Sequence, residues 1–351
     1  MAINEAKLNE FMGKAVGDIG AAMSATLVLI GDKLGLYKAM AHAGPMTSAE
    51  LAKKTGTGER YIREWLPNQA AGGYVTYDAA TGKYTLPEEQ AFALADEGSP
   101  AFIQGAFQII ASLFRDEPKI TERFKSGEGM DWGEHDRCLF EGTERFFRPG
   151  YVGNLIANWI PALDGVDEKL RKGIKAADIG CGHGASTILM AQAFPKSEFV
   201  GFDYHEPSIL AARQRAEKAG VAGRCRFEVA RSTDYPGKGY GFVAHFDCLH
   251  DMGDPVGAAR HVKETLAPDG TWMIVEPFAG DKVEDNLHAV GRVFYAASTM
   301  VCVPASLAHH GPALGAQAGE ARLRQVVTSG GFTRFRRATQ TPFNLVLEAR
   351  P

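Results

Sequence analysis

The stretch Asp178-Ile179-Gly180-Cys181-Gly182-His183-Gly184 decides the fold. It begins at the end of the apolar run 176–179 and leads into the helical run 185–194. This is the pattern of a strand, a tight turn and a helix. Glycine lets the backbone turn sharply at this point and leaves no Cβ in the way of a ligand. The stretch therefore predicts one strand–loop–helix unit of an α/β sheet, with a ligand lying against the loop.

The chain beyond residue 175 alternates strand-like apolar runs with helical runs. This alternation is typical of an α/β fold in which helices cover both faces of a mostly parallel sheet. The predicted strands are Ala176–Ile179, Glu198–Phe202, Cys225–Val229, Phe242–Phe246, Thr271–Val275 and Pro342–Leu347.

The first hundred residues follow a different pattern. Residues 1 to about 40 place apolar side chains at helical spacing, so this helix must bury one face, and dimerisation is one use for it. Thr47 and Glu50 have the spacing of a capping box at the start of a short second helix. A third helix over 59–71 and short strands at 74–77 and 83–86 follow. Helix, helix, helix and hairpin form the order of a winged helix.

The third helix of a winged helix would carry the DNA contacts. It offers Arg60 and Arg63 here, but Glu59 and Glu64 cancel their charge. A DNA-reading helix needs a basic excess, so an interaction module is the favoured interpretation and a ligand-sensing transcriptional regulator the alternative.

Length and composition favour a multi-domain soluble protein. The chain has 351 residues, 45% hydrophobic and 23% charged residues and a net charge of −4, which offers no field to gather nucleic acid or an anionic membrane. We expect a winged-helix and dimerisation domain at 1–98, a helical linker and substrate cap at 99–172, and a ligand-binding α/β domain at 173–351.

Cysteine usage and the N-terminus favour the cytoplasm. The five cysteines are scattered and form no CxxC pair, so no metal site is predicted. The N-terminus lacks the pattern of a secretory signal. The apolar run 19–30 lies between Asp18 and Asp32 and is shorter than the roughly 20 residues that span a bilayer.

The spacing of the glycine loop leaves two ligands open. Gly180, Gly182 and Ala185 also satisfy the dinucleotide pattern GxGxxG/A, and Asp203 follows at a distance suited to a ribose in either case. Asp178 separates the two, because its carboxylate would attract an ammonium group and repel a pyrophosphate. A nicotinamide-dependent dehydrogenase is therefore the less favoured interpretation.

A third feature is the segment 266–276, in which a Pro-Asp-Gly turn precedes an apolar strand that ends in Glu276. The run from Asp178 to Glu276 resembles the class I S-adenosylmethionine-dependent methyltransferases. A winged helix joined through a helical cap to that Rossmann-like, seven-stranded domain resembles the small-molecule O-methyltransferases. The tail, with 313–317 and Gly330-Gly331-Phe332, is similar to a bacterial branch of that group. The resemblance implies S-adenosylmethionine as cofactor, S-adenosylhomocysteine as product and a homodimer formed through the N-terminal domain.

The resemblance also assigns cofactor-binding residues. Asp178, Gly180, Gly182 and Gly184 would hold the methionine end of the cofactor, and Asp203 would hold the ribose.

Further contacts to the cofactor are implied for five other residues. Tyr204 would lie against the adenine, and Asp234, or Ser232 in an alternative alignment, would contact the adenine amino group. Phe246 would pack near the sulfonium, where the plant-type enzymes tend to have a lysine. Tyr151 would reach the cofactor's carboxylate.

The segment 246–254 resembles the region in which plant-type O-methyltransferases carry a catalytic histidine followed by an aspartate, here His250 and Asp251. A histidine with a pKa near 6.5 can accept a hydroxyl proton at about neutral pH. Glu276 matches the acid that would orient the second ring nitrogen. A structural His250, with transfer to sulfur, nitrogen or carbon that needs no base, is the alternative.

The methyl acceptor would be a small molecule held by the cap and by the segment after the fifth strand. The candidate contacts are Trp132, His135, Phe147, Arg148 and Met300.

Overall fold

The computed structural model describes residues 3–351 and divides them between two compact units. The first holds Met1–Ser112 and Glu141–Pro149, and the second Leu113–Phe140 and Gly150–Pro351. Two long helices, α6 (Gln104–Ser126) and α7 (Cys138–Asn154), contribute to both units. The domain limits expected at 98 and 172 stay predictions.

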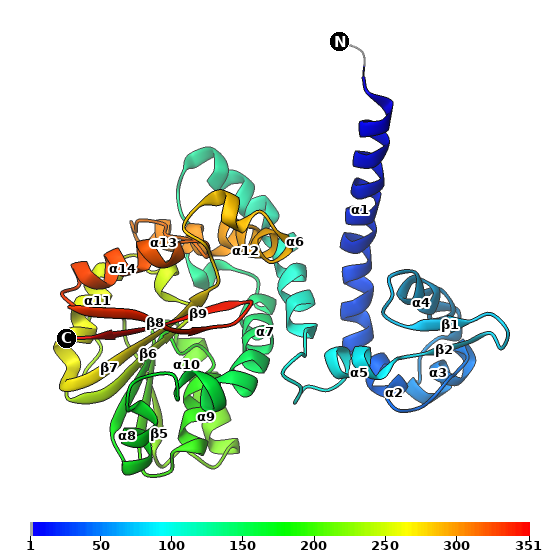
Figure 1. The fold of residues 1–351 in the computed structure, drawn as a ribbon. Coiled ribbons are helices and arrows are strands. Elements are labelled where there is room, and N and C mark those ends of the chain that lie inside the picture. The colour runs from blue at the N-terminus through cyan, green and yellow to red at the C-terminus, as the bar shows by residue number, and fades with distance from the viewer. Residues whose placement is uncertain (1–2) are drawn as a thin grey trace. The chain divides into compact units, whose positions relative to one another are not determined.

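The N-terminal unit contains the predicted winged helix. Its helices are α1 (Glu5–Lys33), α2 (Leu36–Met40), α3 (Ser48–Thr55), α4 (Glu59–Ala71) and α5 (Glu88–Leu94), and β1 (Thr76–Asp78) pairs antiparallel with β2 (Lys83–Thr85) (Figure 1). The helix expected over residues 1–40 is interrupted at Gly35, whose φ of 67° separates α1 from α2. The capping box is present, since the Thr47 hydroxyl accepts from the Glu50 amide at 3.2 Å and the Glu50 carboxylate accepts from the Thr47 amide at 2.7 Å.

Close backbone contacts explain why the middle of α7, Glu141–Pro149, belongs to this unit. A Cβ on Gly105 of α6 would lie 2.3 Å from the Phe146 amide nitrogen, so only glycine permits the two helices to approach so closely. Arg145 of α7 also binds both carboxylate oxygens of Asp32, at the end of α1, at 2.7 and 3.1 Å. A two-pronged arginine–carboxylate pair of this kind fixes direction as well as distance.

The second unit is built on a seven-stranded sheet of order β5-β4-β3-β6-β7-β9-β8. The strands are β3 (Lys175–Ile179), β4 (Glu198–Asp203), β5 (Cys225–Val229), β6 (Tyr240–Phe246), β7 (Leu266–Pro277), β8 (Arg334–Gln340) and β9 (Asn344–Arg350). The first five are parallel, whereas β9 runs antiparallel to both β7 and β8. All six predicted strands are present, and β8 was missed. The α/β fold class is confirmed.

Helices cover both faces of the sheet. Figure 1 shows α9 (Ala185–Ala193) and α10 (Glu206–Lys218) on one side, and α11 (Pro255–Thr265) and α14 (Gly319–Ser329) on the other. Every residue of β6 is buried, as expected for a central parallel strand covered on both faces. The remaining elements are η1 (Trp132–Glu134), η2 (Leu155–Trp159), α8 (Val166–Lys172), η3 (Leu249–Asp251), η4 (Val283–Asn286), α12 (Ala289–Ala297), η5 (Ser298–Cys302) and α13 (Val303–Ala308).

The order of the strands locates the site. From β3 the chain builds outward through β4 to β5, then crosses back to β6 on the other side of β3. In such sheets ligands bind beyond the carboxyl ends of the strands where the order reverses, here between β3 and β6. The glycine loop leaves β3 and the segment with His250 leaves β6 at that edge.

Two helical stretches are long and apolar enough to cross a membrane by length and composition, α1 and the run 289–308. Core helices of water-soluble proteins meet the same criterion, so these two carry little weight.

Candidate active site at the carboxyl edge of the sheet

The three glycines of the loop after β3 all have left-handed backbone angles, with φ of 72° at Gly180, 50° at Gly182 and 77° at Gly184. Their surroundings differ. A Cβ on Gly180 would lie 2.7 Å from Sγ of Cys248, and one on Gly184 would lie 2.6 Å from the Phe227 ring. A Cβ on Gly182 would have no atom within 4 Å. The direction of the missing Cβ leads into open space at Gly182 alone of the three.

Asp178 lies at the end of β3 and is fully buried. Its Oδ2 atom accepts hydrogen bonds from the hydroxyls of Ser186 and Thr187, both at 2.6 Å, whereas Oδ1 has no partner among the described residues. Burial raises its pKa to about 6 against the two hydroxyl bonds, which lower it. An unpartnered carboxylate oxygen at the start of the glycine loop suits a ligand that brings a positive charge or a donor.

Asp203 ends the neighbouring strand β4. One carboxylate oxygen accepts from the Gly182 amide and the other from the His205 amide, each at 2.9 Å. Burial raises its pKa, and the amide bonds oppose that rise. Each oxygen keeps a second acceptor position for a ligand hydroxyl. Tyr204 follows with 43% of its surface exposed, and its ring lies edge-on to His309 at 5.7 Å.

The loop after β5 holds the two residues proposed for the adenine amino group. Asp234 is exposed, and its carboxylate accepts from the Arg231 amide at 3.2 Å within a turn. Ser232 is half-buried in the same turn. The loop starts beside the ribose candidate, since the Ala230 amide donates to the carbonyl of Asp203 at 3.0 Å. Neither assignment is tested by these contacts, and both stay predictions.

Phe246, the last residue of β6, is buried with its ring 5.2 Å from that of Tyr151. The Tyr151 hydroxyl donates to Asp247 at 3.0 Å. Burial and then the nearby Asp247 charge raise the pKa of Tyr151 well above its usual value. The predicted contact from Tyr151 to the cofactor's carboxylate stays a prediction, and in the structure its hydroxyl binds this neighbouring acid.

Asp247 is a site residue that the sequence analysis missed. It has a left-handed φ of 52°, which is uncommon outside glycine. Asn344 of β9 donates to its other oxygen at 2.9 Å. Burial, followed by the charge of Glu276, raises its pKa to about 8. Its position directly after the most buried strand, at the edge where the strand order reverses, was the signal that could have identified it.

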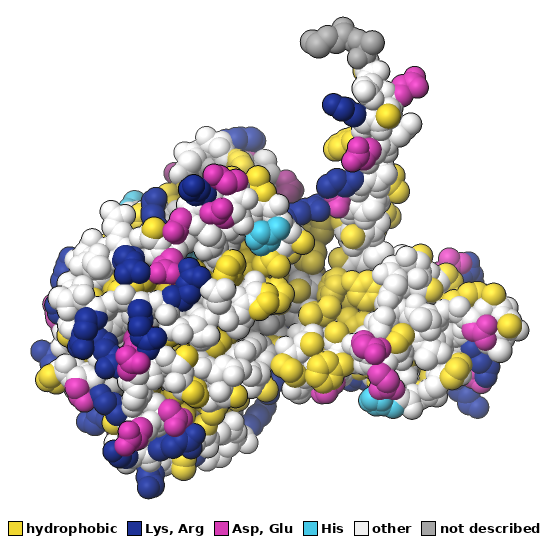
Figure 2. All heavy atoms as spheres, viewed as in Figure 1, with side chains coloured by type: hydrophobic (Ala, Val, Ile, Leu, Met, Phe, Trp, Pro, Cys, Tyr) yellow, Lys and Arg dark blue, Asp and Glu magenta, His cyan; other side chains and the backbone are white. Residues whose placement is uncertain are grey.

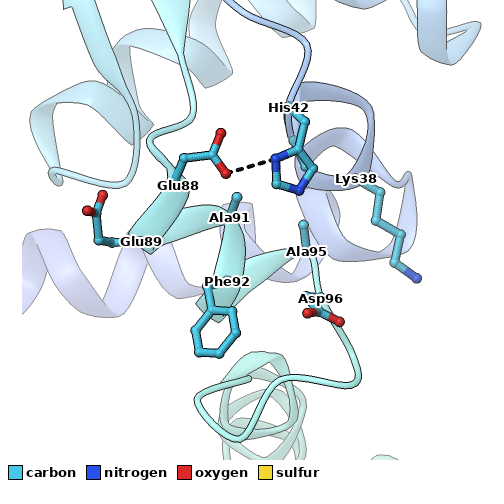
Figure 3. Close-up of a pocket in the computed structure, with 9 residues that line it drawn as sticks. Lys38, His42, Glu88, Glu89, Ala91, Phe92, Ala95 and Asp96 are labelled. Atoms are coloured by element: carbon cyan, nitrogen blue, oxygen red, sulfur yellow. Dashed lines mark ion pairs between the residues drawn. The ribbon is translucent and has the colours of Figure 1, made fainter.

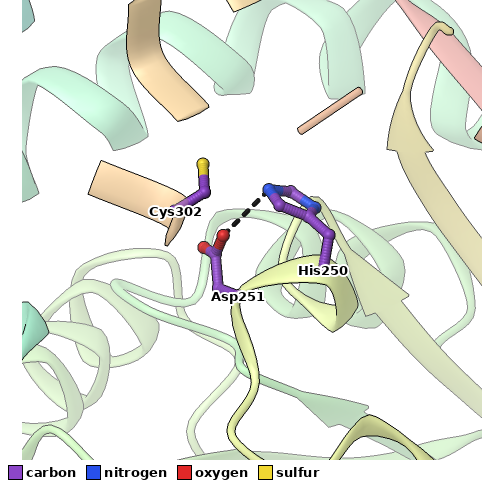
Figure 4. Close-up of side chains that lie close together, drawn as sticks. All are labelled: His250, Asp251 and Cys302. Atoms are coloured by element: carbon purple, nitrogen blue, oxygen red, sulfur yellow. Dashed lines mark ion pairs between the residues drawn. The ribbon is translucent and has the colours of Figure 1, made fainter. Parts of the chain in front are cut away.

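His250 and Glu276 form the hydrogen-bonded pair that the resemblance implies. Nδ1 of His250, in η3, contacts a carboxylate oxygen of Glu276, at the end of β7, and the other oxygen accepts from the Leu249 amide at 2.9 Å. Nε2 of His250 lies 2.9 Å from Oδ1 of Asp251 (Figure 4). Burial alone would lower the pKa of His250, but the carboxylates of Asp251 and Glu276 outweigh it and raise the pKa well above 6.5. The imidazole is thus held in its charged form between two acids.

Cys302 of η5 lies beside this pair. Its sulfur, Nε2 of His250 and a carboxylate oxygen of Asp251 are within 4.8 Å of one another (Figure 4). These three atoms are of types that bind transition metals. Burial raises the pKa of the Cys302 thiol to about 12, so a metal would have to displace its proton.

The proposed acceptor contacts fall in both units. Trp132 and Met300 are half-buried, and His135 is buried with Nδ1 2.9 Å from Asp116. Phe147 and Arg148 belong to the N-terminal unit, so their place in an acceptor site stays a prediction.

The N-terminal unit has an open surface hollow between α2 and α5 (Figure 3). His42 pairs with Glu88 at 2.8 Å on its rim, where both side chains are exposed. Phe92 and Ala95 line the hollow (Figure 3). The catalytic candidates all lie in the other unit.

Comparison with known proteins agrees with this geometry. Residues 22–96 match the model of the Rv2258c-like winged HTH domain, and residues 170–327 match that of a methyltransferase domain. Residues 170–327 therefore form a methyltransferase domain and residues 22–96 a winged-helix domain, the combination expected for class I S-adenosylmethionine-dependent methyltransferases with an N-terminal winged helix. The predicted family and cofactor are thereby confirmed.

Relatives of this methyltransferase support the same family. The chain is 30% identical over 141 residues to 27-O-demethylrifamycin SV methyltransferase of Amycolatopsis mediterranei (strain S699). The matched region covers 40% of this chain and 46% of the relative. It is 28% identical over 99 residues to ubiquinone biosynthesis O-methyltransferase of Cereibacter sphaeroides (strain KD131 / KCTC 12085), covering 28% and 39%. The chain thus matches less than half the length of each of these two curated relatives.

Solved structures share the whole fold. Mitomycin 7-O-methyltransferase has a TM-score of 0.73 at 20% identity, with 99% of this chain and 100% of that chain covered. Human N-acetylserotonin methyltransferase, solved in complex with S-adenosylmethionine, has a TM-score of 0.70 at 16% identity, with 100% and 99% covered. At these identities the likeness concerns the fold alone.

Proposed function

We propose that this methyltransferase transfers a methyl group to a hydroxyl of a small molecule in the cytoplasm. The observation that carries the proposal is the buried pair of His250 and Glu276 at the carboxyl ends of β6 and β7. A histidine oriented by a carboxylate on one nitrogen is the arrangement that general-base chemistry requires. The names of two relatives, 27-O-demethylrifamycin SV methyltransferase and ubiquinone biosynthesis O-methyltransferase, agree with an oxygen acceptor.

The glycine loop and the two acids beside it fit S-adenosylmethionine. The open side of Gly182 leaves room for a ligand, the unpartnered oxygen of Asp178 can accept from its ammonium group, and Asp203 can accept from its ribose hydroxyls. When bound, the cofactor supplies a methyl group on a positively charged sulfur. Asp178, Asp203 and their neighbours position it and exclude water.

His250 would take the hydroxyl proton of the acceptor on Nε2. That nitrogen faces Asp251 in the structure, so Asp251 must first take the Nε2 proton of the imidazolium and turn away with it, which leaves a lone pair on Nε2. Its side chain is 23% exposed and has room to move, whereas Glu276 is 2% exposed and is fixed by the Leu249 amide. As the acceptor O–H bond breaks, the proton passes to Nε2 and the oxygen lone pair forms the new bond to the methyl carbon.

The contact with Asp251 also favours a second candidate. If Asp251 stays in place, His250 stays an imidazolium and cannot accept a proton. The enzyme would then methylate a sulfur, nitrogen or carbon acceptor by proximity, and His250 would only position it.

Substitution of His250 by alanine distinguishes the two. A hydroxyl methyltransferase that uses this base should lose about 10²- to 10⁴-fold in turnover while binding of S-adenosylhomocysteine is retained. Near-normal turnover would contradict the base. His42→Asn, an exposed histidine of the N-terminal unit, is the matched control.

A second copy of the chain is the partner that we propose for α1. Leu8, Met12, Val16, Ile19 and Met23 recur at helical spacing and are 43–72% exposed. Figure 2 shows hydrophobic side chains along this helix. The spacing places them on one face, and a self-complementary apolar stripe of this kind is buried when two copies pair.

A further inference from the structure

A second buried histidine–carboxylate pair lies outside the one described above. It joins Asp116 of α6 to His135, which follows η1, with Nδ1 of the histidine 2.9 Å from Oδ2 of the acid. Their side chains are 0% and 2% exposed for His135 and Asp116. The acid is fixed in turn, because it accepts from the Asp136 amide at 3.0 Å and lies 3.3 Å from Nζ of Lys119.

The other ring nitrogen of His135 has no partner. Its Nε2 atom is buried and makes no hydrogen bond among the described residues. Burial lowers the pKa of His135, and the bond to Asp116 only partly opposes this. A neutral ring whose Nδ1–H donates a hydrogen bond to Asp116 presents a lone pair at Nε2. A buried acceptor without a donor destabilises the fold, so the unpartnered Nε2 points to a ligand that donates to it.

This environment differs from that of the histidine at the end of β6. Both nitrogens of His250 face carboxylates, and those charges favour its imidazolium form. His135 faces one carboxylate on one nitrogen, and its second nitrogen is available. The two histidines therefore offer a ligand different chemistry.

The segment that carries His135 packs on the cofactor edge of the sheet. Asp131 pairs with His309 at 2.7 Å, and the His309 ring contacts Tyr204, directly after Asp203. The ring of Phe140 lies 4.8 Å from that of His205 on the same loop, and Trp132 lies 5.4 Å from Phe140. An aromatic wall thus joins the His135 segment to the loop that follows the ribose candidate.

We propose that Nε2 of His135 accepts a hydrogen bond from the methyl acceptor. The acceptor is then a small hydroxylated aromatic molecule that carries an O–H or N–H donor in addition to the group that is methylated. The inference rests on the proposed function for the acceptor class. An acceptor that places an ether or a carboxylate next to Nε2 donates no hydrogen bond to it, and we expect such a molecule to bind weakly.

Calorimetry with catechol as the probe tests this, on full-length protein saturated with S-adenosylhomocysteine. We expect catechol to bind the wild type, and His135→Ala to bind it about tenfold more weakly. 1,2-Dimethoxybenzene, which has no donor, should bind the wild type weakly, and His135→Ala should not weaken its binding further. His135→Gln, whose amide oxygen can accept in place of Nε2, should recover part of the loss, and His42→Asn should match the wild type.

Equal catechol affinity in the wild type and His135→Ala would overturn the inference, and so would the absence of catechol binding to the wild type. Binding of S-adenosylhomocysteine reports folding of each variant. If the wild type does not bind S-adenosylhomocysteine, that result would contradict the proposed function and not the role of His135. If His135→Ala does not fold, Asp116→Asn provides the same test, because an amide that donates to Nδ1 moves the ring proton to Nε2 and should weaken catechol binding.

Discussion

Nε2 of His250 lies 2.9 Å from Oδ1 of Asp251, on the side of the ring opposite Glu276. Removing the Asp251 charge by Asp251→Asn should lower the pKa of His250, because burial then meets one opposing carboxylate instead of two. An NMR titration of the His250 ring measures this directly. Asp269→Asn, an exposed acid paired with Lys169, is the control. An unchanged His250 titration in Asp251→Asn would show that Asp251 does not hold the imidazolium.

Gly182 and Gly184 should respond differently to alanine. Both have positive φ, which costs alanine about 1–2 kcal/mol. A Cβ at Gly182 enters open space, so Gly182→Ala should fold and bind S-adenosylhomocysteine at least tenfold more weakly. A Cβ at Gly184 meets the Phe227 ring and should cost a further ~1–3 kcal/mol of unfolding free energy. Urea unfolding and calorimetry on both variants check this, and equal stability losses would contradict it.

Asp178→Asn should separate stability from binding. Because the folded protein raises the pKa of Asp178 from 3.8 to about 6, its carboxylate destabilises the fold increasingly as the pH rises through this range. Without the cofactor, Asp178→Asn should therefore be more stable than the wild type at pH 8, by on the order of 2–3 kcal/mol, and the difference should vanish near pH 4. Its affinity for S-adenosylmethionine should fall. Denaturant unfolding at the two pH values tests the sign, and a less stable variant at pH 8 would refute it.

The stripe on α1 predicts the oligomeric state. Ile19 is 59% exposed, so Ile19→Asp leaves the isolated chain intact and places a charge in the proposed interface between copies. Light scattering should find a dimer for the wild type and a monomer for this variant. Ala21→Asp, which lies away from the stripe on the helical wheel, should remain a dimer. A monomeric wild type would contradict the proposed dimer through α1.

The sequence predicted the α/β sheet well because its strands are buried on both faces. The run 242–246 is apolar apart from His245, and such a run has few alternative structures. The missed strand β8, Arg334–Gln340, is an edge strand that has three arginines and no buried position, so its apolar signal is weak.

The candidate site was predictable where a residue type and a strand end coincide. Asp178, Asp203 and Glu276 each end a parallel strand, and the structure places them at one edge of the sheet. Asp247 offered the same signal, because it directly follows β6, but the sequence analysis missed it. Asp116 could not be recognised in this way, because its importance depends on burial and on a partner on another element. Asp247 meets Asn344 and Asp116 meets His135 only once the chain has folded.

The measurement that tests the account most directly is calorimetric titration of S-adenosylhomocysteine and of NAD into the wild type and Asp203→Ala. We predict one S-adenosylhomocysteine site per chain, no binding of NAD, and a loss of about 10- to 100-fold in affinity for Asp203→Ala, because the ribose hydroxyls lose a charged acceptor. Binding of NAD with none of S-adenosylhomocysteine, or unchanged affinity in Asp203→Ala, would contradict the assignment of this edge of the sheet as the cofactor site.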